Sequence, residues 1–383
     1  MMTLAYLLAV IVITVALVVG HLAFWTWYYQ RPRPPDERHF VRTDDGWTLA
    51  LARLRPRAAG PAQGEPVVCF PGFACNGRLF DFDDTHSLAG HLANLGFDVW
   101  MIDPRGTGHS ERPGLFGKGW GFGFQDYAHR DAPAALRHVV RTTGHPRVLW
   151  VGHSMGGLVG MHVALRPMGD HLAGVVALGS PADFSMHFEH LGRFSAWILD
   201  RFLRGWPVVR LGRLSTAIAP LAGWWRGWPE TLFTQARNTK ARSLRHFLVE
   251  VVDDVPRQLM DEFADQVVRG TGFDGRPAHL THQAMAAARV PVLALAGDHD
   301  RIAPPPSATA AAAQVACDDA TGTVVGSEVV HFGHLDLVVG DAAPTDIYPR
   351  IADWLLARRS ACSMASGEAP AARAAARAPS TPG

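Results

Sequence analysis

Short apolar runs alternate with helix-compatible stretches through most of this chain, and the alternation constrains the fold more than any other feature. Apolar runs of about four to eight residues are typical of strands buried on both faces of a parallel sheet. The predicted strands are Pro66–Phe70, Phe97–Ile102, Val148–Gly152, Ala173–Leu178, Val290–Ala296 and Gly322–Val330. The predicted helices are Thr85–Leu95, Gln125–Val140, Met155–Arg166, Ser307–Val315 and Ile347–Ala357. Right-handed crossovers then place helices on both faces of one mostly parallel, doubly wound α/β sheet.

Two further strand-like runs precede this alternation. His39–Arg42 and Trp47–Leu54 flank Asp44-Asp45-Gly46, which is a turn signature. We therefore expect an antiparallel hairpin at the start of the folded part of the chain.

One interval interrupts the alternation and is predicted to be an inserted helical lid. Residues 183–285 lack strand-like alternation and separate the two parts of the core, residues 38–182 and 286–359. The interval is rich in tryptophan, at Trp197, Trp206, Trp224, Trp225 and Trp228. Large residues of this kind either build the core of a small helical subdomain or contact substrate or membrane.

The N-terminus is predicted to be a transmembrane anchor over residues 1–29. Leu4–Tyr28 contains no charged residue, and as a helix it would extend about 37 Å against a hydrocarbon core of about 30 Å. Aromatic residues cluster at its C-terminal end, as at a membrane interface. A cleaved signal peptide is the alternative, but the segment has no positively charged start and is long for one. Residues 30–37 are rich in proline and predict a stiff linker.

The overall charge and the composition near the chain ends limit the partners and the cellular location that the sequence predicts. The chain has 36 Lys and Arg against 35 Asp and Glu, so no global field favours nucleic acid. Arginines follow the anchor, and the positive-inside rule therefore favours a single-pass protein whose folded domain is cytoplasmic, with the outer face as the alternative. Residues 360–383 are mostly Ala, Pro, Ser and Arg and predict a disordered tail. The cysteines, expected to be free thiols, are Cys69, Cys75, Cys317 and Cys362.

The strand Val148–Gly152 leads directly into Gly152-His153-Ser154-Met155-Gly156, followed by a predicted helix. This strand–turn–helix context is what a nucleophile elbow needs, because the serine occupies a strained turn. Side chains at positions 152 and 156 would clash with the backbone, which explains the glycines. Ser154 is therefore the candidate nucleophile.

Through this motif and others the sequence resembles the α/β-hydrolase superfamily, over about residues 38 to 358. Asp103-Pro104-Arg105-Gly106-Thr107-Gly108-His109-Ser110 is similar to a structural turn of that family. Phe70-Pro71-Gly72-Phe73 stands where the family commonly has His-Gly, and the resemblance implies an oxyanion hole from the backbone N–H groups of Phe73 and Met155. Two further segments, Ser87-Leu88-Ala89 and Gly96-Phe97-Asp98-Val99-Trp100, are similar to segments of acid lipases and of polyhydroxyalkanoate synthases. The synthases usually use a cysteine as nucleophile, so a serine at position 154 favours hydrolysis over polymer synthesis.

A serine hydroxyl needs a base and an orienting carboxylate, and the resemblance identifies both later in the chain. Gly297-Asp298-His299-Asp300 is similar to the family's acid loop, with Asp300 as the acid and Asp298 as its rival. His331-Phe332-Gly333-His334-Leu335-Asp336 is similar to the histidine loop, with His334 as the base and His331 as the runner-up. The order Ser, Asp, His is the one expected for this fold.

The resulting expectation is a serine hydrolase of carboxylic esters, with lipid as the leading substrate class and no metal or organic cofactor. An acyltransferase or an amide or thioester hydrolase would use the same three residues, because fold and nucleophile do not select the leaving group. A non-catalytic membrane-bound scaffold is the alternative from another class. Haloalkane dehalogenase or epoxide hydrolase chemistry is disfavoured, since it needs a carboxylate at position 154.

Overall fold

The structure is a computed structural model of the whole chain. It describes residues 2–31, 33–58, 64–114, 117–183, 206–224, 227, 230–269, 272–273 and 285–359. The predicted tail, Cys362 and the tryptophans at 197, 225 and 228 lie outside the described residues.

Eight strands form one mixed, mostly parallel sheet in the order β1-β2-β4-β3-β5-β6-β9-β10. In chain order they are β1 (Glu37–Arg42), β2 (Thr48–Leu54), β3 (Val67–Phe70), β4 (Val99–Asp103), β5 (Val148–His153), β6 (Leu172–Leu178), β9 (Val292–Gly297) and β10 (Ala320–Val325). β1 and β2 form the predicted antiparallel hairpin, and β2 also runs antiparallel to β4. The remaining pairs are parallel. The sequence prediction of the sheet is confirmed, strand by strand.

Most boundaries shift by one to three residues, and two differ from the prediction by more than that in extent or in kind. The last strand ends at Val325 rather than Val330, because Gly326 has a φ of 151° and turns the chain away from the sheet. The helix predicted at Gln125–Val140 consists of α3 (Phe124–Asp126), a π-helical turn η2 (Tyr127–Asp131) and α4 (Ala132–Thr143). α4 ends at Gly144, whose φ of 74° is typical of a helix C-terminus.

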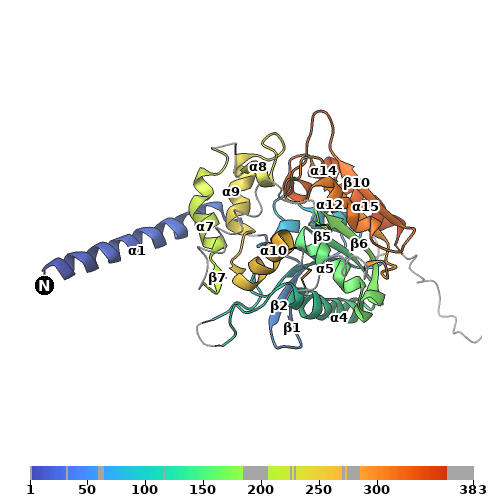
Figure 1. Cartoon of the computed structure of the whole chain (residues 1–383), viewed down its shortest axis with the longest axis horizontal. Coiled ribbons are helices and arrows are strands. Elements are labelled where there is room, and N and C mark those ends of the chain that lie inside the picture. The colour runs from blue at the N-terminus through green and yellow to red at the C-terminus, as the bar shows by residue number, and fades with distance from the viewer. Residues whose placement is uncertain are drawn as a thin grey trace, which may run out of the picture.

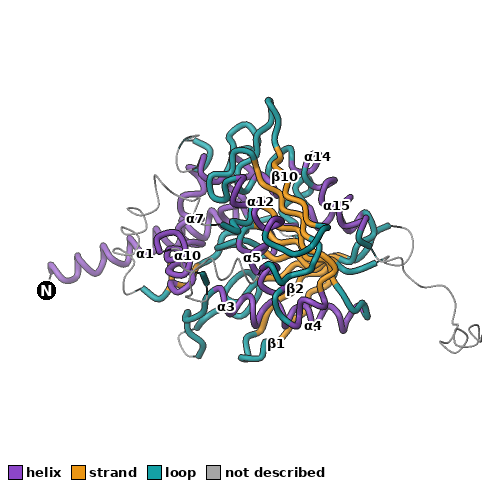
Figure 2. Tube along the Cα trace, turned by 45° about the vertical axis from the view of Figure 1, so that its right-hand side comes forward, coloured by secondary structure: helices purple, strands orange, loops and turns teal. Residues whose placement is uncertain are grey.

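Helices cover both faces of the sheet (Figures 1 and 2). One face packs against α4, α5 (Met155–Ala164) and α12 (Pro305–Ala313), and the other packs against α2 (Leu88–Asn94), α13 (Asp336–Val339) and α15 (Tyr348–Ala357). Shorter helices complete the core: η1 (Gly77–Phe80), η3 (Pro167–His171) and α14 (Ala343–Asp346).

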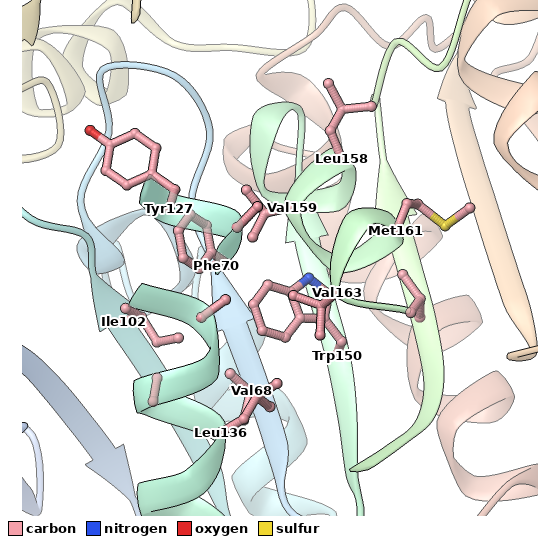
Figure 3. Close-up of a cluster of buried hydrophobic side chains, with 14 of the residues drawn as sticks. Val68, Phe70, Ile102, Tyr127, Leu136, Trp150, Leu158, Val159, Met161 and Val163 are labelled. Carbon is pink, nitrogen blue, oxygen red and sulfur yellow. The ribbon is translucent and has the colours of Figure 1, made fainter. Parts of the chain in front are cut away.

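Side-chain alternation along the central strands supplies both layers of the core. On β3, Val68 and Phe70 face the α4 and α5 side, whereas Val67 and Cys69 face the α2 and α15 side. Figure 3 shows the first layer, where Phe70 lies beside Trp150; their rings stack with centroids 5.5 Å apart. Both faces are therefore closed by helices, and the central strands read as continuous apolar runs.

The described part of the 183–285 interval, called the insertion below, is mainly helical. Its helices are α7 (Leu211–Ile218), the short η5 (Ala219–Leu221), α8 (Glu230–Phe233), α9 (Ala241–Glu250) and α10 (Arg257–Arg269). It also contains a two-residue antiparallel ladder of β7 (Val208–Val209) and β8 (Val255–Pro256), which the sequence pattern did not predict. Two residues are too few to produce a visible alternation.

At the N-terminus, α1 (Met2–Tyr29) projects from the body of the molecule (Figure 1). Its stretch Ala5–Tyr29 has the length and hydropathy to cross a membrane, and the most apolar part of that stretch is not buried inside the protein. The same properties fit a signal sequence.

Candidate active site

Ser154 lies in a strained turn between β5 and α5. Its φ is 52° and its ψ is −118°, and among the described non-glycine residues only Ala74 shares a positive φ. The Ser154 N–H donates to the carbonyl of Leu178 at the end of β6 (2.7 Å), which fixes the turn against the neighbouring strand. Strain of this kind persists only where the surroundings impose it, and it is concentrated at functional sites.

The glycines around Ser154 are required by close backbone approach. A Cβ on Gly152 would lie 2.2 Å from the carbonyl carbon of Gly156, and a Cβ on Gly156 would lie 2.0 Å from the carbonyl oxygen of Phe70. The clash predicted for these two positions is confirmed. The strand, the turn and α5 therefore pack too tightly for any other residue type at either position.

Asp300 and His334 form a buried hydrogen-bonded pair. His334 Nδ1 lies 2.9 Å from Asp300 Oδ2, and the two residues are only 4% and 3% exposed. The other carboxylate oxygen, Oδ1, accepts from the N–H groups of Ile302 (2.8 Å) and Ala303 (2.7 Å). Because Asp300 holds Nδ1–H, the imidazole of His334 presents Nε2 as its free nitrogen.

Gly179 allows this pair to lie close to the end of β6. Its φ is 54°, and a Cβ there would be 3.1 Å from Asp300 Oδ2 and 3.3 Å from His334 Nδ1. Gly179 directly follows Leu178, the acceptor for Ser154, so the elbow and the Asp300–His334 pair meet at the same strand end.

His153 connects the elbow to the histidine loop (residues 331–336). Its Nε2 lies 3.0 Å from the carbonyl oxygen of His334, and the two rings have centroids 4.8 Å apart. Burial lowers the pKa of His153 to about 3, so the ring is neutral and its Nε2–H donates to that carbonyl. Sequence reasoning missed this contact, because His153 occupies the variable position of the elbow motif and its partner is 181 residues away.

The two rival residues, Asp298 and His331, pair with each other, whereas Asp300 pairs with His334. Asp298 Oδ2 lies 2.6 Å from His331 Nδ1, and Asp298 Oδ1 accepts from the Phe332 N–H at 2.8 Å. With His299 they form a group whose possible ligand atoms lie within 4.8 Å of one another. However, the rings of His299 and His331 stack in parallel, 4° apart, so their nitrogen lone pairs do not converge on one point. A ring would have to rotate before this group could hold a metal ion.

Phe73 lies in the loop after β3, beside the elbow. A Cβ on the preceding Gly72 would be 3.2 Å from Ser154 Cβ. Among the described residues, no hydrogen-bond acceptor is found for the N–H of Phe73 or Met155. The Phe73 ring packs edge-on against Phe263 of α10, with centroids 5.2 Å apart.

The insertion holds the chain just after Phe73 through backbone and side-chain bonds. The N–H of Asp253 donates to the Ala74 carbonyl (2.8 Å), and the Asn76 N–H donates to the Val251 carbonyl (3.1 Å). Asn76 Nδ2 also donates to Asp253 Oδ2 (2.9 Å). The segment that follows α9 therefore fixes the loop that carries Phe73.

The insertion also holds the histidine loop, through the segment 233–239 that follows α8. Asp336 is fully buried and accepts from the Gln235 N–H (2.7 Å), the Gly333 N–H (2.7 Å) and the Thr239 hydroxyl. Burial raises the pKa of Asp336 to about 6, against the lowering effect of these bonds. In addition, the Leu335 N–H donates to the Phe233 carbonyl at 2.8 Å.

Asp103 and Arg105 have the structural role expected of them. Asp103 accepts from the N–H groups of Gly77 (2.8 Å) and His109 (2.8 Å), which joins two loops. Arg105 is 1% exposed and binds Asp131, with Nη2 to Oδ1 at 2.6 Å. The described cysteines are free thiols.

Comparison with known proteins agrees with this architecture. The family described as alpha/beta hydrolase fold matches residues 65–218. A probable lipase of Schizosaccharomyces pombe is 26% identical over 217 residues, covering 52% of this chain and 44% of the relative. Human lysosomal acid lipase/cholesteryl ester hydrolase is 33% identical over 138 residues, covering 33% of this chain and 34% of the relative. The matches thus span less than half the length of these curated relatives.

Two solved structures show the same fold. A thermophilic esterase from Thermogutta terrifontis has a TM-score of 0.52 at 20% identity, with 85% of this chain and 100% of that chain covered. A monoacylglycerol lipase from Paleococcus ferrophilus has a TM-score of 0.53 at 20% identity, covering 81% and 99%. The chain therefore has the α/β-hydrolase fold. Within that class it distantly resembles lipases, acid lipases included, and it is related to hydrolases of the lipase and esterase kind.

Proposed function

We propose that this protein is a membrane-anchored serine hydrolase that cleaves carboxylic esters of lipid or other apolar acyl substrates. The observation that carries the proposal is the strained elbow at Ser154 beside the buried Asp300–His334 pair. Strain at a serine, with a histidine and a carboxylate at the same strand end, is the arrangement that activates a hydroxyl nucleophile.

In the proposed reaction, Ser154 Oγ attacks the acyl carbon while His334 Nε2 takes its proton. Asp300 keeps His334 in the tautomer with Nδ1–H and stabilises the imidazolium that forms. The protonated His334 then gives its proton to the leaving alkoxide, and an acyl-enzyme remains on Ser154. Water attacks this ester with His334 again as the base, which releases the acid and restores the serine.

The N–H groups of Phe73 and Met155 are proposed to stabilise the negative oxygen of the tetrahedral intermediates. Two features support this role: the groups have no hydrogen-bond acceptor among the described residues, and both lie next to Ser154, Phe73 in the adjoining loop and Met155 as the first residue of α5. Preorganised donors of this kind are worth on the order of 3 kcal/mol each in the transition state.

The lipid preference and the membrane attachment are supported by different observations. The proposal of apolar acyl substrates is supported by the names of the relatives, which are a probable lipase and an acid lipase/cholesteryl ester hydrolase. The insertion is proposed to act as the lid over the site. For α1, we propose an uncleaved anchor, because its last residue belongs to the folded body. Tyr29 is 6% exposed, and its carbonyl accepts from His246 Nδ1 at 2.6 Å. Removal of α1 by a signal peptidase would expose this buried contact.

Hydrolysis of p-nitrophenyl esters from acetate to palmitate by the full-length protein in detergent tests the catalytic proposal. We expect activity to rise with chain length and to fall at least about 10³-fold in Ser154→Ala and His334→Ala. Activity on acetate alone would contradict the lipid preference. Equal activity in the variants would contradict the triad.

Extraction of membranes at alkaline pH tests the anchor. We expect the full-length chain to stay in the membrane fraction with α1 intact at its N-terminus. Recovery of a soluble protein whose sequence starts after residue 29 would show a signal peptide instead.

A further inference from the structure

The insertion carries an exposed apolar face that its own packing does not explain. Leu214 and Ile218 of α7 and Leu221 of η5 are 55%, 47% and 58% exposed, and Trp224 just beyond is 83% exposed. The first two lie four residues apart and Leu221 three further on, so all three share one side of the helix. These four residues are called the α7 face below. Contiguous large apolar side chains on a protein surface usually mark a contact with another molecule.

The α7 face is continuous with the N-terminal helix. α1 contacts both α7 and α9, which lie beside its C-terminal part (Figure 1). His21 Nε2 lies 3.0 Å from the carbonyl oxygen of Ala217. At the end of α1, the ring of Tyr29 packs edge-on against His246 of α9, with centroids 5.4 Å apart.

These contacts set the depth of α7 relative to the proposed span. His21 precedes Tyr29 by about 12 Å along the helix axis. If the aromatic residues from Phe24 to Tyr29 lie at headgroup level, the boundary of the hydrocarbon core falls near residue 23, and His21 lies just inside it. Since Ala217 contacts His21, the C-terminal end of α7 lies at that boundary as well.

We propose that the α7 face is inserted into the lipid bilayer at the boundary between headgroups and acyl chains, beside α1. The proposal rests on the anchor in the proposed function and goes further, because it gives the membrane a second point of contact within the insertion. The exposed Arg213 at the start of α7 is suited to the headgroup side of such a helix.

This placement joins the membrane to both loops of the candidate site. α9 packs against α1, and the Arg31 N–H donates to Glu250 at its C-terminal end. The segment 233–239 before α9 holds the histidine loop, and the segment 251–253 after it holds the loop of Phe73. The bilayer thus positions the helix whose two flanks fix the groups proposed for catalysis.

Fluorescence quenching in vesicles tests the proposal on the full-length protein. Leu221→Cys, Leu17→Cys and Val329→Cys are each labelled with an environment-sensitive dye in a background carrying Cys317→Ser and Cys362→Ser, since Cys69 and Cys75 are buried. Leu17 lies in α1. Val329, which is 77% exposed and follows β10 in the second part of the core, is the control outside α1 and the insertion. The vesicles contain phosphatidylcholine and phosphatidylglycerol with a nitroxide on acyl carbon 5. Labelling of Ser154 by a fluorophosphonate is followed in every variant.

We expect at least twofold quenching at positions 221 and 17 and less than about a tenth at position 329. Quenching at 17 but not at 221 would overturn the α7 proposal and leave the anchor intact. Blue-shifted emission at 221 without quenching would place the α7 face against protein, such as a second copy, and would also overturn it. Absence of quenching at both 17 and 221 would refute the anchor together with the inference. The fluorophosphonate signal reports the serine hydrolase separately in each case.

Discussion

In the α/β core, the strands β3, β5 and β6 are buried at every residue, whereas in the insertion α9 buries two of its ten residues and α7 buries two of eight. The core is held by apolar packing on both faces of the sheet. The insertion packs on that core through fewer apolar side chains, such as Phe247 and Leu259, and is held in addition by hydrogen bonds to two loops of the candidate site and by its contacts with α1. The residues proposed for catalysis therefore lie at the junction between the tightly packed sheet core and the less buried insertion.

The largest loss of stability is expected when one methyl group is added to the core at Gly156. Gly156→Ala would place a Cβ 2.0 Å from the Phe70 carbonyl oxygen, so backbone must move. We predict a loss of more than about 4 kcal/mol in the free energy of unfolding, measured by denaturant titration. The matched control is Gly119→Ala, where no atom lies within 4 Å of the new Cβ and the effect should stay within about 0.5 kcal/mol. Equal stability of the two variants would contradict the packing described here.

The second-largest loss of stability is expected at Asp336, which joins the histidine loop to the insertion. Asp336→Ala removes the carboxylate that accepts from the N–H groups of Gln235 and Gly333 and from the Thr239 hydroxyl. We predict a loss of about 3 kcal/mol and faster proteolysis of the insertion than of the core. Asp336→Asn keeps one acceptor oxygen and should cost clearly less. A uniform change in proteolysis of both regions would show that Asp336 does not act at the junction.

The same carboxyl predicts a pH dependence. The pKa of Asp336 is raised from 3.8 to about 6 in the folded state, so between these values the folded protein keeps a proton that the unfolded chain has released. The contribution of Asp336 to stability therefore falls as pH rises from about 4 to about 6, by up to about 3 kcal/mol, and stays low above pH 6. The melting temperature of wild type relative to Asp336→Asn should decrease over that range. A difference that stays constant with pH would contradict the raised pKa.

The smallest effect on stability is expected in the insertion itself. Phe263→Ala removes the ring that packs on Phe73, and Phe263 is only partly buried. We predict a loss of about 1 to 2 kcal/mol in stability but a fall of about tenfold in kcat, because the loop bearing the Phe73 N–H loses support. Phe40→Ala, at a ring 62% exposed on β1, is the control and should change neither quantity. A changed KM with unchanged kcat would indicate a role in substrate binding instead.

Much of the core could be predicted from the sequence because its determinants are local. The strand runs, the Asp44-Asp45-Gly46 turn and the glycines at 152 and 156 each express their structure in neighbouring residues. The contacts of His153 with the His334 carbonyl and of Asp336 with the Gln235 N–H could not be predicted, since these partners are distant in sequence and bond through backbone atoms, which leave no trace in residue type. The early end of β10 was missed because Val329 and Val330 continue the apolar pattern after Gly326 has turned the chain.

Covalent labelling of the full-length protein with a fluorophosphonate, followed by mass spectrometry of its peptides, tests the central claim most directly. We predict one modified serine, Ser154, at neutral pH, with labelling lost in Ser154→Ala and slowed at least about 10²-fold in His334→Ala. A serine elsewhere in the chain carrying the label, or labelling that survives Ser154→Ala, would contradict the assignment of the nucleophile.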